Sequence, residues 1–405
     1  MQSLLKVSNQ GKSGRPRVLV IEPWIKHYRV PFFTQLHSAL SYEGIDLVVA
    51  YSKPNSEHAI RQDNVDLQAA WALKVNAYWV TNRLLYQPLW KQIARADLVI
   101  VRSEVKHMIN YPLLILSALR IKTVAYWGLG PNMHPDRVAA SEWIKERLFN
   151  KADWYFAYTP SVVDYLKKIR MPVEKITNVQ NATDTTELRR LIDSLPDVDI
   201  TQAKYELTGA HDSRIGLYCG LLHMVKSLPL LLDAARLVKQ QCPQFHLVLI
   251  GNGPDRPWLE NAIAHEPWIH YLGSKYGRES ALYYKMADAF LLAGTAGLAI
   301  VDSFAAGLPL LATRLSTHPP EISYVINDVN GRLASHDANA FASSILEVLM
   351  SPDLMAKLRD GARESGSRYT MEAMVLNFST GIKKCLEHYG RYQSRAAFEV
   401  ISTSE

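Results

Sequence analysis

Cysteine is scarce in this sequence of 405 residues, and its three copies lie far apart. Cys219, Cys242 and Cys385 are odd in number, and none of their spacings is one that holds a zinc ion. This usage argues against a disulfide-stabilised secreted domain and against a cysteine metal centre. It is typical of reduced thiols in a cytoplasmic protein.

Long apolar runs are also absent. No run approaches the ~18 consecutive apolar residues of a membrane-spanning helix. The longest uncharged run, residues 289–301, is interrupted by glycines and is followed by Asp302. The N-terminal segment MQSLLKVSNQGKSGRPR has no apolar region long enough for a signal peptide. We therefore expect any contact with a membrane to be peripheral.

A dense basic stripe is the third missing feature. Lys and Arg number 45 against 39 Asp and Glu, which gives a formal net charge of +6. A protein that binds nucleic acid usually concentrates its positive charge more than this, so no nucleic-acid partner is expected. The mild excess suits an anionic ligand or a membrane surface. With 48% apolar and 21% charged residues, the chain is long enough for two folded domains.

The sequence does contain a regular alternation of short apolar runs with helical periodicity. The runs predict strands over 17–22, 45–51, 97–101, 122–127, 154–158 and 175–180, and then over 215–219, 245–250, 269–272, 289–293 and 309–313. Helices are expected between them, for example over 31–40, 111–119 and 138–149, and over most of 337–390. This order predicts an α/β fold with parallel sheets covered by helices. The polar stretch 184–213 marks the junction between two domains.

The most informative segment is residues 289–313, AFLLAGTAGLAIVDSFAAGLPLLAT. An apolar strand leads into Gly294 and Gly297, which open a short helix carrying Asp302. Backbone N–H groups at such a turn are unpaired and the helix N-terminus is partly positive, so a nucleotide's phosphates usually lie there. The acid one turn inside the helix can reach a ribose hydroxyl. The alternative is a buried helix whose glycines serve close packing only.

Three further glycine turns follow strands of the second half: Gly220, the pair Gly251 and Gly253, and Gly273. Lys226 lies six residues after Gly220 at the start of a helix, where it can meet a diphosphate as a point charge. A solvated lysine is the alternative. Open α/β domains bind ligands at the carboxyl ends of their strands. Two facing domains therefore predict one cleft that joins a nucleotide-bound donor to a second substrate.

The order of these segments resembles the retaining GT-B glycosyltransferases of the large fourth sequence family, which move a sugar from a nucleotide-sugar to an acceptor. The similarity covers most of the chain and is densest over 215–365. Its main segments are LYCGLLHMVKSLPLLLDAARLV, LVLIGNGPDRPWLENA, GLAIVDSFAAGLPLLAT and PPEISYVINDVNGRL. In the first half, YRVPFF resembles the acceptor-side opening of bacterial polysaccharide transferases, and KITNVQNATDTTEL resembles the close of the N-terminal domain.

The resemblance implies a GT-B fold of two facing Rossmann-like domains. It places an N-terminal acceptor-binding domain over 15–190, a nucleotide-sugar-binding domain over 205–368, and a C-terminal helix over 369–390 that returns toward the first domain. The implied donor-binding residues are Gly220, Lys226, Gly251, Gly253, Gly297, Leu298 and Asp302. The acceptor-side candidates are His27, Tyr28, Arg29, Trp127 and Asn132. No catalytic side chain is assigned.

The sequence also departs from the family pattern. The family signature has two Glu eight residues apart, where this chain has Gly294 and Asp302. The usual Arg after the strand glycine is Leu221, although the family's Lys matches Lys226. The glycine pair after the first strand is missing, and Leu129 stands where a histidine is often found. Loss of the first Glu threatens recognition of the donor sugar more than departure of the leaving group, because backbone amides and a cation stabilise a leaving nucleoside diphosphate.

We therefore expect a glycosyltransferase that retains the anomeric configuration and acts on a glycan or lipid-linked acceptor in surface polysaccharide synthesis. The nucleotide-sugar is its substrate, and neither a cofactor nor a metal is expected. Two alternatives stay open: a catalytically degenerate partner subunit, and a nucleotide-sugar epimerase on the same fold.

A cytoplasmic location with peripheral contact to the inner membrane face is expected. The candidate contact is the segment SEWIKERLFNK, residues 141–151, which combines bulky apolar side chains with Lys and Arg. The alternative is an ordinary amphipathic helix that packs its apolar side on the sheet.

Overall fold

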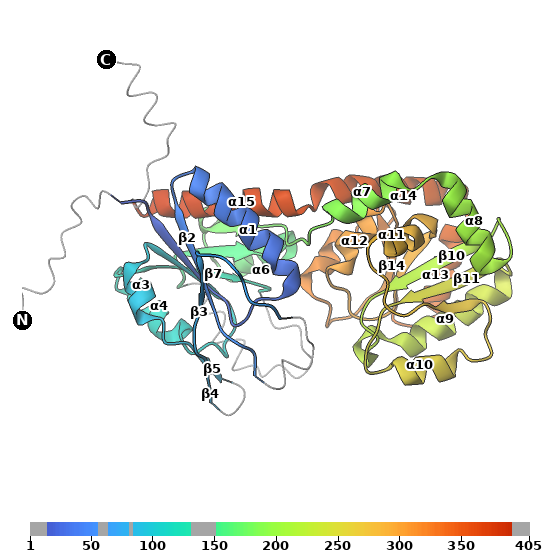
Figure 1. The fold of residues 1–405 in the computed structure, drawn as a ribbon, viewed down its shortest axis with the longest axis horizontal. Coiled ribbons are helices and arrows are strands. Elements are labelled where there is room, and N and C mark those ends of the chain that lie inside the picture. The colour runs from blue at the N-terminus through green and yellow to red at the C-terminus, as the bar shows by residue number, and fades with distance from the viewer. Residues whose placement is uncertain (1–13, 56–63, 81–83, 131–150, 391–405) are drawn as a thin grey trace, which may run out of the picture.

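The computed structural model describes residues 14–55, 64–80, 84–130 and 151–390, and within them the chain builds two separate parallel sheets. Figure 1 shows the two sheets side by side along the long axis of the molecule, each covered by helices. The strands of the first sheet end at Asn178, and those of the second begin at Arg214. The prediction of an α/β fold with two Rossmann-like halves is confirmed.

The first sheet has seven strands in the order β3-β2-β1-β6-β7-β8-β9, and all neighbouring pairs are parallel. The strands are β1 (Arg17–Ile21), β2 (Asp46–Tyr51), β3 (Ala72–Lys74), β6 (Leu98–Arg102), β7 (Thr123–Gly128), β8 (Trp154–Ala157) and β9 (Ile176–Asn178). Every residue of β7 is buried, because a central parallel strand is covered on both faces.

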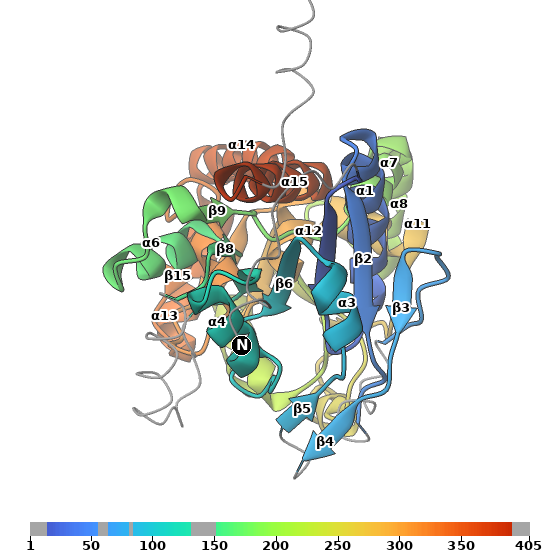
Figure 2. The ribbon, with the colours of Figure 1, turned by 90° about the vertical axis from the view of Figure 1, so that its left-hand side faces the viewer.

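The described helices of this half are α1 (Val30–Tyr42), α3 (Trp90–Arg95), α4 (Asn110–Ala118) and α6 (Pro160–Lys168). A 3-10 turn, η1 (His27–Arg29), leads into α1, and η2 (Val173–Lys175) precedes β9. An antiparallel ribbon of β4 (Tyr78–Val80) and β5 (Leu84–Tyr86) lies outside the sheet. Figure 2 shows α3, α4 and this ribbon together, away from the C-terminal helices.

The second sheet has six parallel strands in the order β12-β11-β10-β13-β14-β15. They are β10 (Arg214–Cys219), β11 (Phe245–Ile250), β12 (Ile269–Tyr271), β13 (Ala289–Leu292), β14 (Leu310–Thr313) and β15 (Gly331–Ala334). Its helical segments are η3 (Met224–Lys226), α9 (Leu228–Gln241), α10 (Arg256–Ala262), α11 (Gly277–Met286), α12 (Ala299–Ala305), η4 (Pro320–Tyr324) and α13 (Ala338–Met350). Two helices, α7 (Thr186–Ser194) and α8 (Asp197–Thr208), occupy the junction between the sheets.

The last two helices, α14 (Pro352–Arg368) and α15 (Met371–His388), join the halves. They begin at Ser351 and Thr370, whose hydroxyls accept the N–H groups of residues three positions on. Helix α15 packs on α1, β8 and β9 of the first half. A Cβ at Gly381 would lie 2.5 Å from the Thr177 hydroxyl, so glycine is what lets this helix approach the sheet closely.

The observed strands confirm the predicted ones, and the differences are confined to short elements. The sequence pattern does not predict β3, β4, β5 or β15, because these short strands are mostly not buried and so form no continuous apolar run. The predicted helix over 138–149 and the candidate membrane segment 141–151 lie outside the described residues. The domain boundaries 15–190, 205–368 and 369–390 stay predictions.

Candidate active site

A cleft of about 1160 Å³ lies where the carboxyl ends of the two sheets face each other. One wall comes from the loops after β1, β6, β7, β8 and β9, and the other from the loops after β13 and β14. Single-ligand pockets are usually ~300–1,000 Å³. The cleft is therefore large enough for two substrates, as the facing-domain prediction requires.

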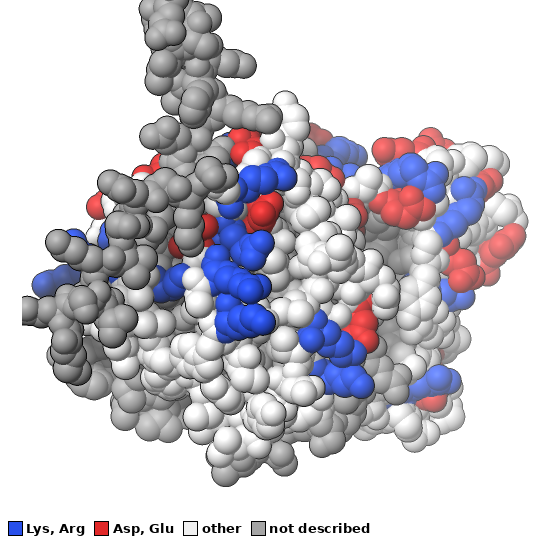
Figure 3. Space-filling model, turned by 60° about the vertical axis from the view of Figure 1, so that its left-hand side comes forward, with Lys and Arg blue, Asp and Glu red and all other residues white. Residues whose placement is uncertain are grey.

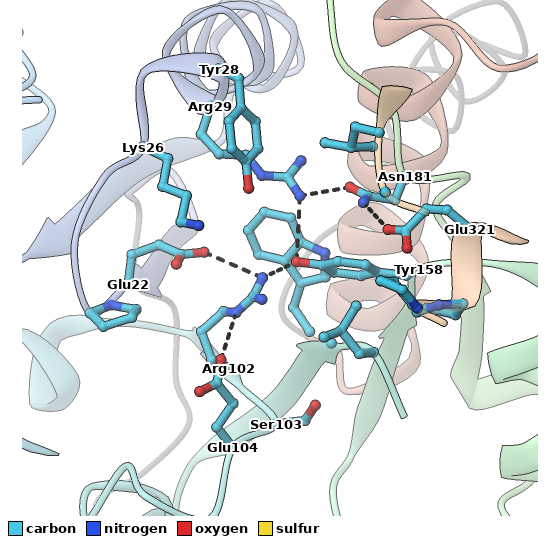
Figure 4. A pocket seen from close by; sticks show the side chains of 18 of the residues that line it. Glu22, Lys26, Tyr28, Arg29, Arg102, Ser103, Glu104, Tyr158, Asn181 and Glu321 are labelled. Atoms are coloured by element: carbon cyan, nitrogen blue, oxygen red, sulfur yellow. Dashed lines mark hydrogen bonds and ion pairs between the residues drawn. The ribbon is translucent and has the colours of Figure 1, made fainter. Parts of the chain in front are cut away.

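Four side chains of the first wall come directly from strand ends. Glu22 follows β1, Arg102 ends β6, Trp127 lies near the end of β7, and Tyr158 follows β8. Parallel strands bring their carboxyl ends to one edge of a sheet, so segments far apart in the chain meet there. Figure 4 shows the labelled side chains converging on the centre of the cleft.

Two arginines lie against an aromatic pair in this wall. The guanidinium carbons of Arg102 and Arg29 lie 5.0 and 5.1 Å from the centre of the Trp127 ring system. The Tyr158 hydroxyl accepts a hydrogen bond from Arg102 and one of 3.4 Å from Arg29. A cation over an aromatic face contributes up to ~2 kcal/mol when desolvated. The aromatic pair therefore fixes two positive charges at the cleft.

Two carboxylates balance Arg102. Glu22 and Glu104 approach its guanidinium at 3.8 and 3.9 Å. Burial raises the pKa of Glu22 despite the opposing effect of Arg102. Burial alone would also raise the pKa of Glu104, but the neighbouring His107, Lys106 and Arg102 together hold it well below its usual range. Glu104 is therefore ionised at neutral pH.

Asn181 joins the two walls of the cleft. Its Oδ1 accepts a hydrogen bond of 2.7 Å from Arg29, and its Nδ2 donates one of 2.5 Å to Glu321 of η4. The Tyr324 hydroxyl, also from η4, donates to the carbonyl oxygens of Tyr158 and Asn181 at 3.2 and 3.1 Å. Glu321 is 3% exposed, and burial raises its pKa. Figure 4 shows the path from Arg29 through Asn181 to Glu321, which ties the second half to the first.

The glycine turn after β13 is held by its neighbours on the side away from the cleft. Its Thr295 N–H donates to the Val225 carbonyl at 2.9 Å, and its Ala296 N–H donates to His318 Nδ1 at 3.1 Å. The other ring nitrogen of His318 lies 2.6 Å from the Thr313 carbonyl, which fixes it as a donor. Burial lowers the pKa of His318, so this neutral tautomer persists at neutral pH.

The next two residues of the turn line the cleft. Gly297 and Leu298 both line it, and no acceptor for their N–H groups occurs among the residues that the structure describes. Both precede α12, whose N–H groups at Ile300 and Val301 already donate to the Gly297 and Leu298 carbonyls at 3.2 and 2.8 Å. The turn therefore offers backbone donors to an anionic group in the cleft.

Asp302 lies in the cleft one turn into α12. Burial raises the pKa of its carboxyl to about 7. Within the described part of the chain, no hydrogen bond or cation offsets this effect. Asp302 is half-buried, and a carboxylate taken partly out of water without a partner is costly, a cost that hydroxyl groups of a ligand would remove.

Lys226 lies behind the turn and not in the cleft wall. Its ammonium donates to the Thr295 carbonyl at 2.6 Å, and burial lowers its pKa. Its backbone packs on Gly294, where a Cβ would lie 2.1 Å from the Lys226 carbonyl carbon. No side chain therefore fits at the position where the family signature has its first Glu. The contact of Lys226 with a diphosphate stays a prediction.

The glycines after β10 and β11 pack against the neighbouring loop. A Cβ at Gly251 would lie 1.8 Å from the Gly220 carbonyl oxygen, and one at Gly253 would lie 2.1 Å from the Leu222 carbonyl oxygen. This close approach accounts for Gly251 and Gly253 without a ligand, and neither they nor Gly220 line the cleft. Their role in donor binding stays a prediction.

The structure brings four of the five acceptor-side candidates together. His27, Tyr28, Arg29 and Trp127 all line the first wall, whereas Asn132 lies outside the described residues. Arg29 is 7% exposed, and its hydrogen bonds go to protein groups. It therefore holds the wall together as well as lining it.

Other cleft residues were not singled out by the sequence reasoning, namely Glu22, Arg102, Glu104, Tyr158, Asn181 and Glu321. A signal for most of them was present, because they stand at or just after the end of a predicted strand. That is where open α/β sheets form their ligand sites.

Metal and membrane features were sought in the same residues. In the described ranges, no three His, Cys, Asp or Glu side chains lie close enough together to hold a metal ion. None of the helices described there is both long and apolar enough to cross a bilayer.

The second half matches a family model described as "Glycosyl transferases group 1", over residues 213–351. Among curated proteins, the alpha-monoglucosyldiacylglycerol synthase of Acholeplasma laidlawii is 24% identical over 176 residues, covering 42% of this chain and 43% of that protein. The D-inositol 3-phosphate glycosyltransferase of Saccharomonospora viridis is 24% identical over 224 residues, covering 47% and 51%. The chain thus spans about half the length of the curated relatives it matches.

Among solved structures, Alr3699/HepE of Anabaena in complex with UDP superposes with a TM-score of 0.63 at 15% identity, covering 91% of this chain and 99% of that one. The same protein with UDP-glucose gives a TM-score of 0.60 at 16% identity, covering 90% and 99%. These similarities show the GT-B fold, and with it the returning C-terminal helix.

Proposed function

Because this chain belongs to the group 1 glycosyl transferases through residues 213–351, we propose that it transfers a sugar from a nucleotide-sugar to a glycan or lipid-linked acceptor, with retention of anomeric configuration. The observation that carries the proposal is the interdomain cleft. One wall offers the unpaired backbone N–H groups of Gly297 and Leu298 beside the half-buried Asp302 carboxyl, and the other offers two fixed arginines.

The donor's nucleoside diphosphate fits the second wall. The N–H groups of Gly297 and Leu298 are available to phosphate oxygens, and Asp302 is placed to accept hydrogen bonds from ribose hydroxyls. UDP-sugars come first among the donors to test, because the similar Anabaena structures contain UDP and UDP-glucose.

The chemistry then needs little from side chains. The bond between the sugar's anomeric carbon and the diphosphate oxygen breaks, and the backbone donors stabilise the charge that develops on the leaving group. The acceptor hydroxyl oxygen forms the new bond on the same face of the sugar. Its proton passes to an oxygen of the leaving diphosphate, which lies on that face. The arginines of the first wall face the acceptor and the developing negative charge.

The lack of space for a side chain at Gly294 favours a second candidate function, that of a catalytically degenerate subunit. Because no side chain fits there, the chain has no counterpart of the family's first Glu. A degenerate subunit that binds a nucleotide without turnover would tolerate this loss. We place the active transferase first because three of the expected donor-side residues, Gly297, Leu298 and Asp302, line the cleft.

Purified full-length protein incubated with UDP-, GDP-, ADP- and dTDP-sugars, with and without glycan and lipid-linked acceptors, tests the proposal. We expect acceptor-dependent release of nucleoside diphosphate and a product of unchanged anomeric configuration by NMR. A degenerate subunit would bind nucleotide without releasing it from the sugar, and an epimerase would interconvert donor sugars without an acceptor. Either outcome would overturn the transferase assignment.

We also propose that the protein is a cytoplasmic enzyme of surface polysaccharide synthesis that works at the inner face of a membrane. An acceptor that is extracted with the membrane fraction and is glycosylated by the purified protein supports this setting. An acceptor found only among free oligosaccharides contradicts it.

A further inference from the structure

Helix α4 lies at the surface yet has no polar outer side. Its sequence, NYPLLILSA, contains no charged residue. Its inner side, which includes Leu113 and Ser117, is buried, whereas Tyr111, Ile115 and the following Leu119 lie outward on one stripe. Ile115 is 61% exposed and Leu119 is 63% exposed. A helix that is apolar all round is normally covered by protein or by lipid.

The apolar surface continues beyond α4. The β4–β5 ribbon exposes Tyr78, and α3 exposes Trp90. The elements are connected, because Leu85 of β5 donates its N–H to the Lys106 carbonyl at 2.9 Å and Trp90 donates to the Tyr86 hydroxyl at 3.0 Å. The α3–α4 face, defined here as α3, α4, residues 119–122 and the β4–β5 ribbon, therefore consists of adjoining elements that each expose bulky apolar side chains.

The elements of this face carry Lys and Arg but no Asp or Glu, while Asp97 and Glu104 adjoin it and Glu104 pairs with Lys106 at 2.9 Å. Residues 84–96 and 106–122 contain no Asp or Glu, and their Lys and Arg are Lys91, Arg95, Lys106, Arg120 and Lys122. Lys122 donates to the carbonyls of Ala94 and Ala96 at 3.2 and 2.6 Å, which brings the ends of α3 and α4 together. Figure 3 turns this side of the molecule forward and shows a group of blue side chains above a broad white area.

We propose that the α3–α4 face docks onto the surface of an anionic lipid bilayer. Bulky apolar groups bordered by cations, with no acids among them, match the boundary between acyl chains and negatively charged headgroups.

The position of this face relative to the cleft deepens the proposed function, on which this step rests. Asn110, the first residue of α4, donates to the carbonyls of Arg102 and Glu104 at 2.9 and 3.0 Å, and both residues line the cleft. The Tyr111 hydroxyl donates to the carbonyl of Val105, another cleft residue, at 3.0 Å. A docked bilayer would therefore lie next to the acceptor wall, so the acceptor class is an amphiphile whose polar head enters the cleft while its tail stays in the membrane.

Cosedimentation of the full-length protein with vesicles tests the docking surface, and it needs neither donor nor acceptor. A negative result in this assay is therefore distinguishable from a negative result in the transferase assay. The probes are phosphatidylcholine vesicles with and without about a third phosphatidylglycerol, in low and high salt. We expect binding to the anionic vesicles that weakens in high salt. Arg95→Glu with Arg120→Glu should weaken it about twentyfold or more, since each cation near the surface contributes several-fold.

Ile115→Ser with Leu119→Ser should lower binding about tenfold at either salt concentration, because the apolar contact does not depend on screening. The matched controls are Val198→Ser with Leu376→Ser, two exposed apolar residues on α8 and α15, and Lys357→Glu with Lys384→Glu on α14 and α15. Circular-dichroism melting of each variant verifies the fold. Absence of wild-type binding in low salt overturns the proposal, as does equal loss in the controls. Loss of self-association in light scattering with no vesicle binding also overturns it and makes the face an interface between copies.

Discussion

Asp302 makes folding stability depend on pH in an unusual direction. Burial raises the pKa of its carboxyl from 3.8 to about 7. The folded state therefore holds this proton more tightly than the unfolded state. Its contribution to stability is full below about pH 4 and is lost as the pH rises to about 7. Three pKa units correspond to roughly 4 kcal/mol.

Asp302→Asn removes this titration. We expect the variant's melting temperature, relative to wild type, to rise between pH 4.5 and pH 8, measured by differential scanning fluorimetry. Asp360→Asn, an exposed residue of α14, should give a difference that does not change with pH in this way. A constant difference for Asp302→Asn across the same range would contradict burial as the cause of the shift.

The same carboxyl is predicted to bind the donor ribose. Charge-assisted hydrogen bonds contribute ~1.5–3 kcal/mol, so Asp302→Asn should weaken nucleoside diphosphate binding about tenfold or more at pH 8. Wild-type affinity should increase as the pH rises through about 7, because the ionised carboxylate is the better acceptor. Isothermal titration calorimetry measures both effects. Unchanged affinity in the variant would place Asp302 outside the nucleotide site.

Two roles are open to the Lys226 side chain: binding the donor diphosphate, and supporting the glycine turn after β13. Its ammonium already donates to the Thr295 carbonyl. If it also contacts the donor diphosphate, Lys226→Ala should weaken binding of a nucleoside diphosphate about tenfold and leave the corresponding nucleoside nearly unaffected. Lys357→Ala is the control for loss of an exposed lysine. Equal losses for nucleoside and nucleoside diphosphate would show that Lys226 acts only by supporting the turn.

At the scale of elements, the two glycines of the turn between β13 and α12 differ in the space around them. A Cβ at Gly294 would lie 2.1 Å from the backbone of η3, whereas one at Gly297 would meet nothing within 4 Å. We expect Gly294→Ala to lower the free energy of unfolding by about 3 kcal/mol. Gly297→Ala should change it by less than about 1 kcal/mol.

Urea unfolding of the two variants, monitored by tryptophan fluorescence, measures the difference. Gly294→Glu, which restores the family residue, should be less stable still. A Gly294→Ala variant as stable as Gly297→Ala would mean that η3 moves aside readily. The space for the first Glu would then not be closed.

At the scale of the whole molecule, Asn181 carries the polar connection between the halves. Its removal leaves the Arg29 guanidinium and the Glu321 carboxylate, both buried, without this partner. Leaving a buried polar group unsatisfied costs ~1–3 kcal/mol. We therefore expect Asn181→Ala to lower the free energy of unfolding by about 2–4 kcal/mol in urea.

The matched control is Gln202→Ala, whose amide bonds the exposed Glu206 within one helix. It should cost less than about 0.5 kcal/mol, since exposed side-chain bonds on a helix contribute little. Similar values for the two variants would show that the contact between the halves is not sustained by Asn181.

The sequence was sufficient for the elements and for part of the site. Apolar runs predicted every strand of five or more residues, because burial of a parallel strand on both faces demands such a run. It also pointed to Gly297, Leu298 and Asp302, which line the cleft, since the strand, turn and helix that place them are contiguous in the chain. Their role in donor binding stays a prediction. Gly251 and Gly253 were visible too, but the sequence could not show that they pack on a neighbouring loop.

The tertiary structure decided what depends on segments distant in the chain. The bridge from Arg29 through Asn181 to Glu321 spans nearly three hundred residues, and no local pattern predicts which strand ends meet. The closed space at Gly294 depends on where the backbone of Lys226 comes to rest. The sequence of α4 is as apolar as that of a buried helix, so it does not show that one side of this helix is exposed. Local propensity and periodicity thus determined the elements, whereas the contacts between the packed elements decided which side chains face the cleft, which face each other and which face the solvent.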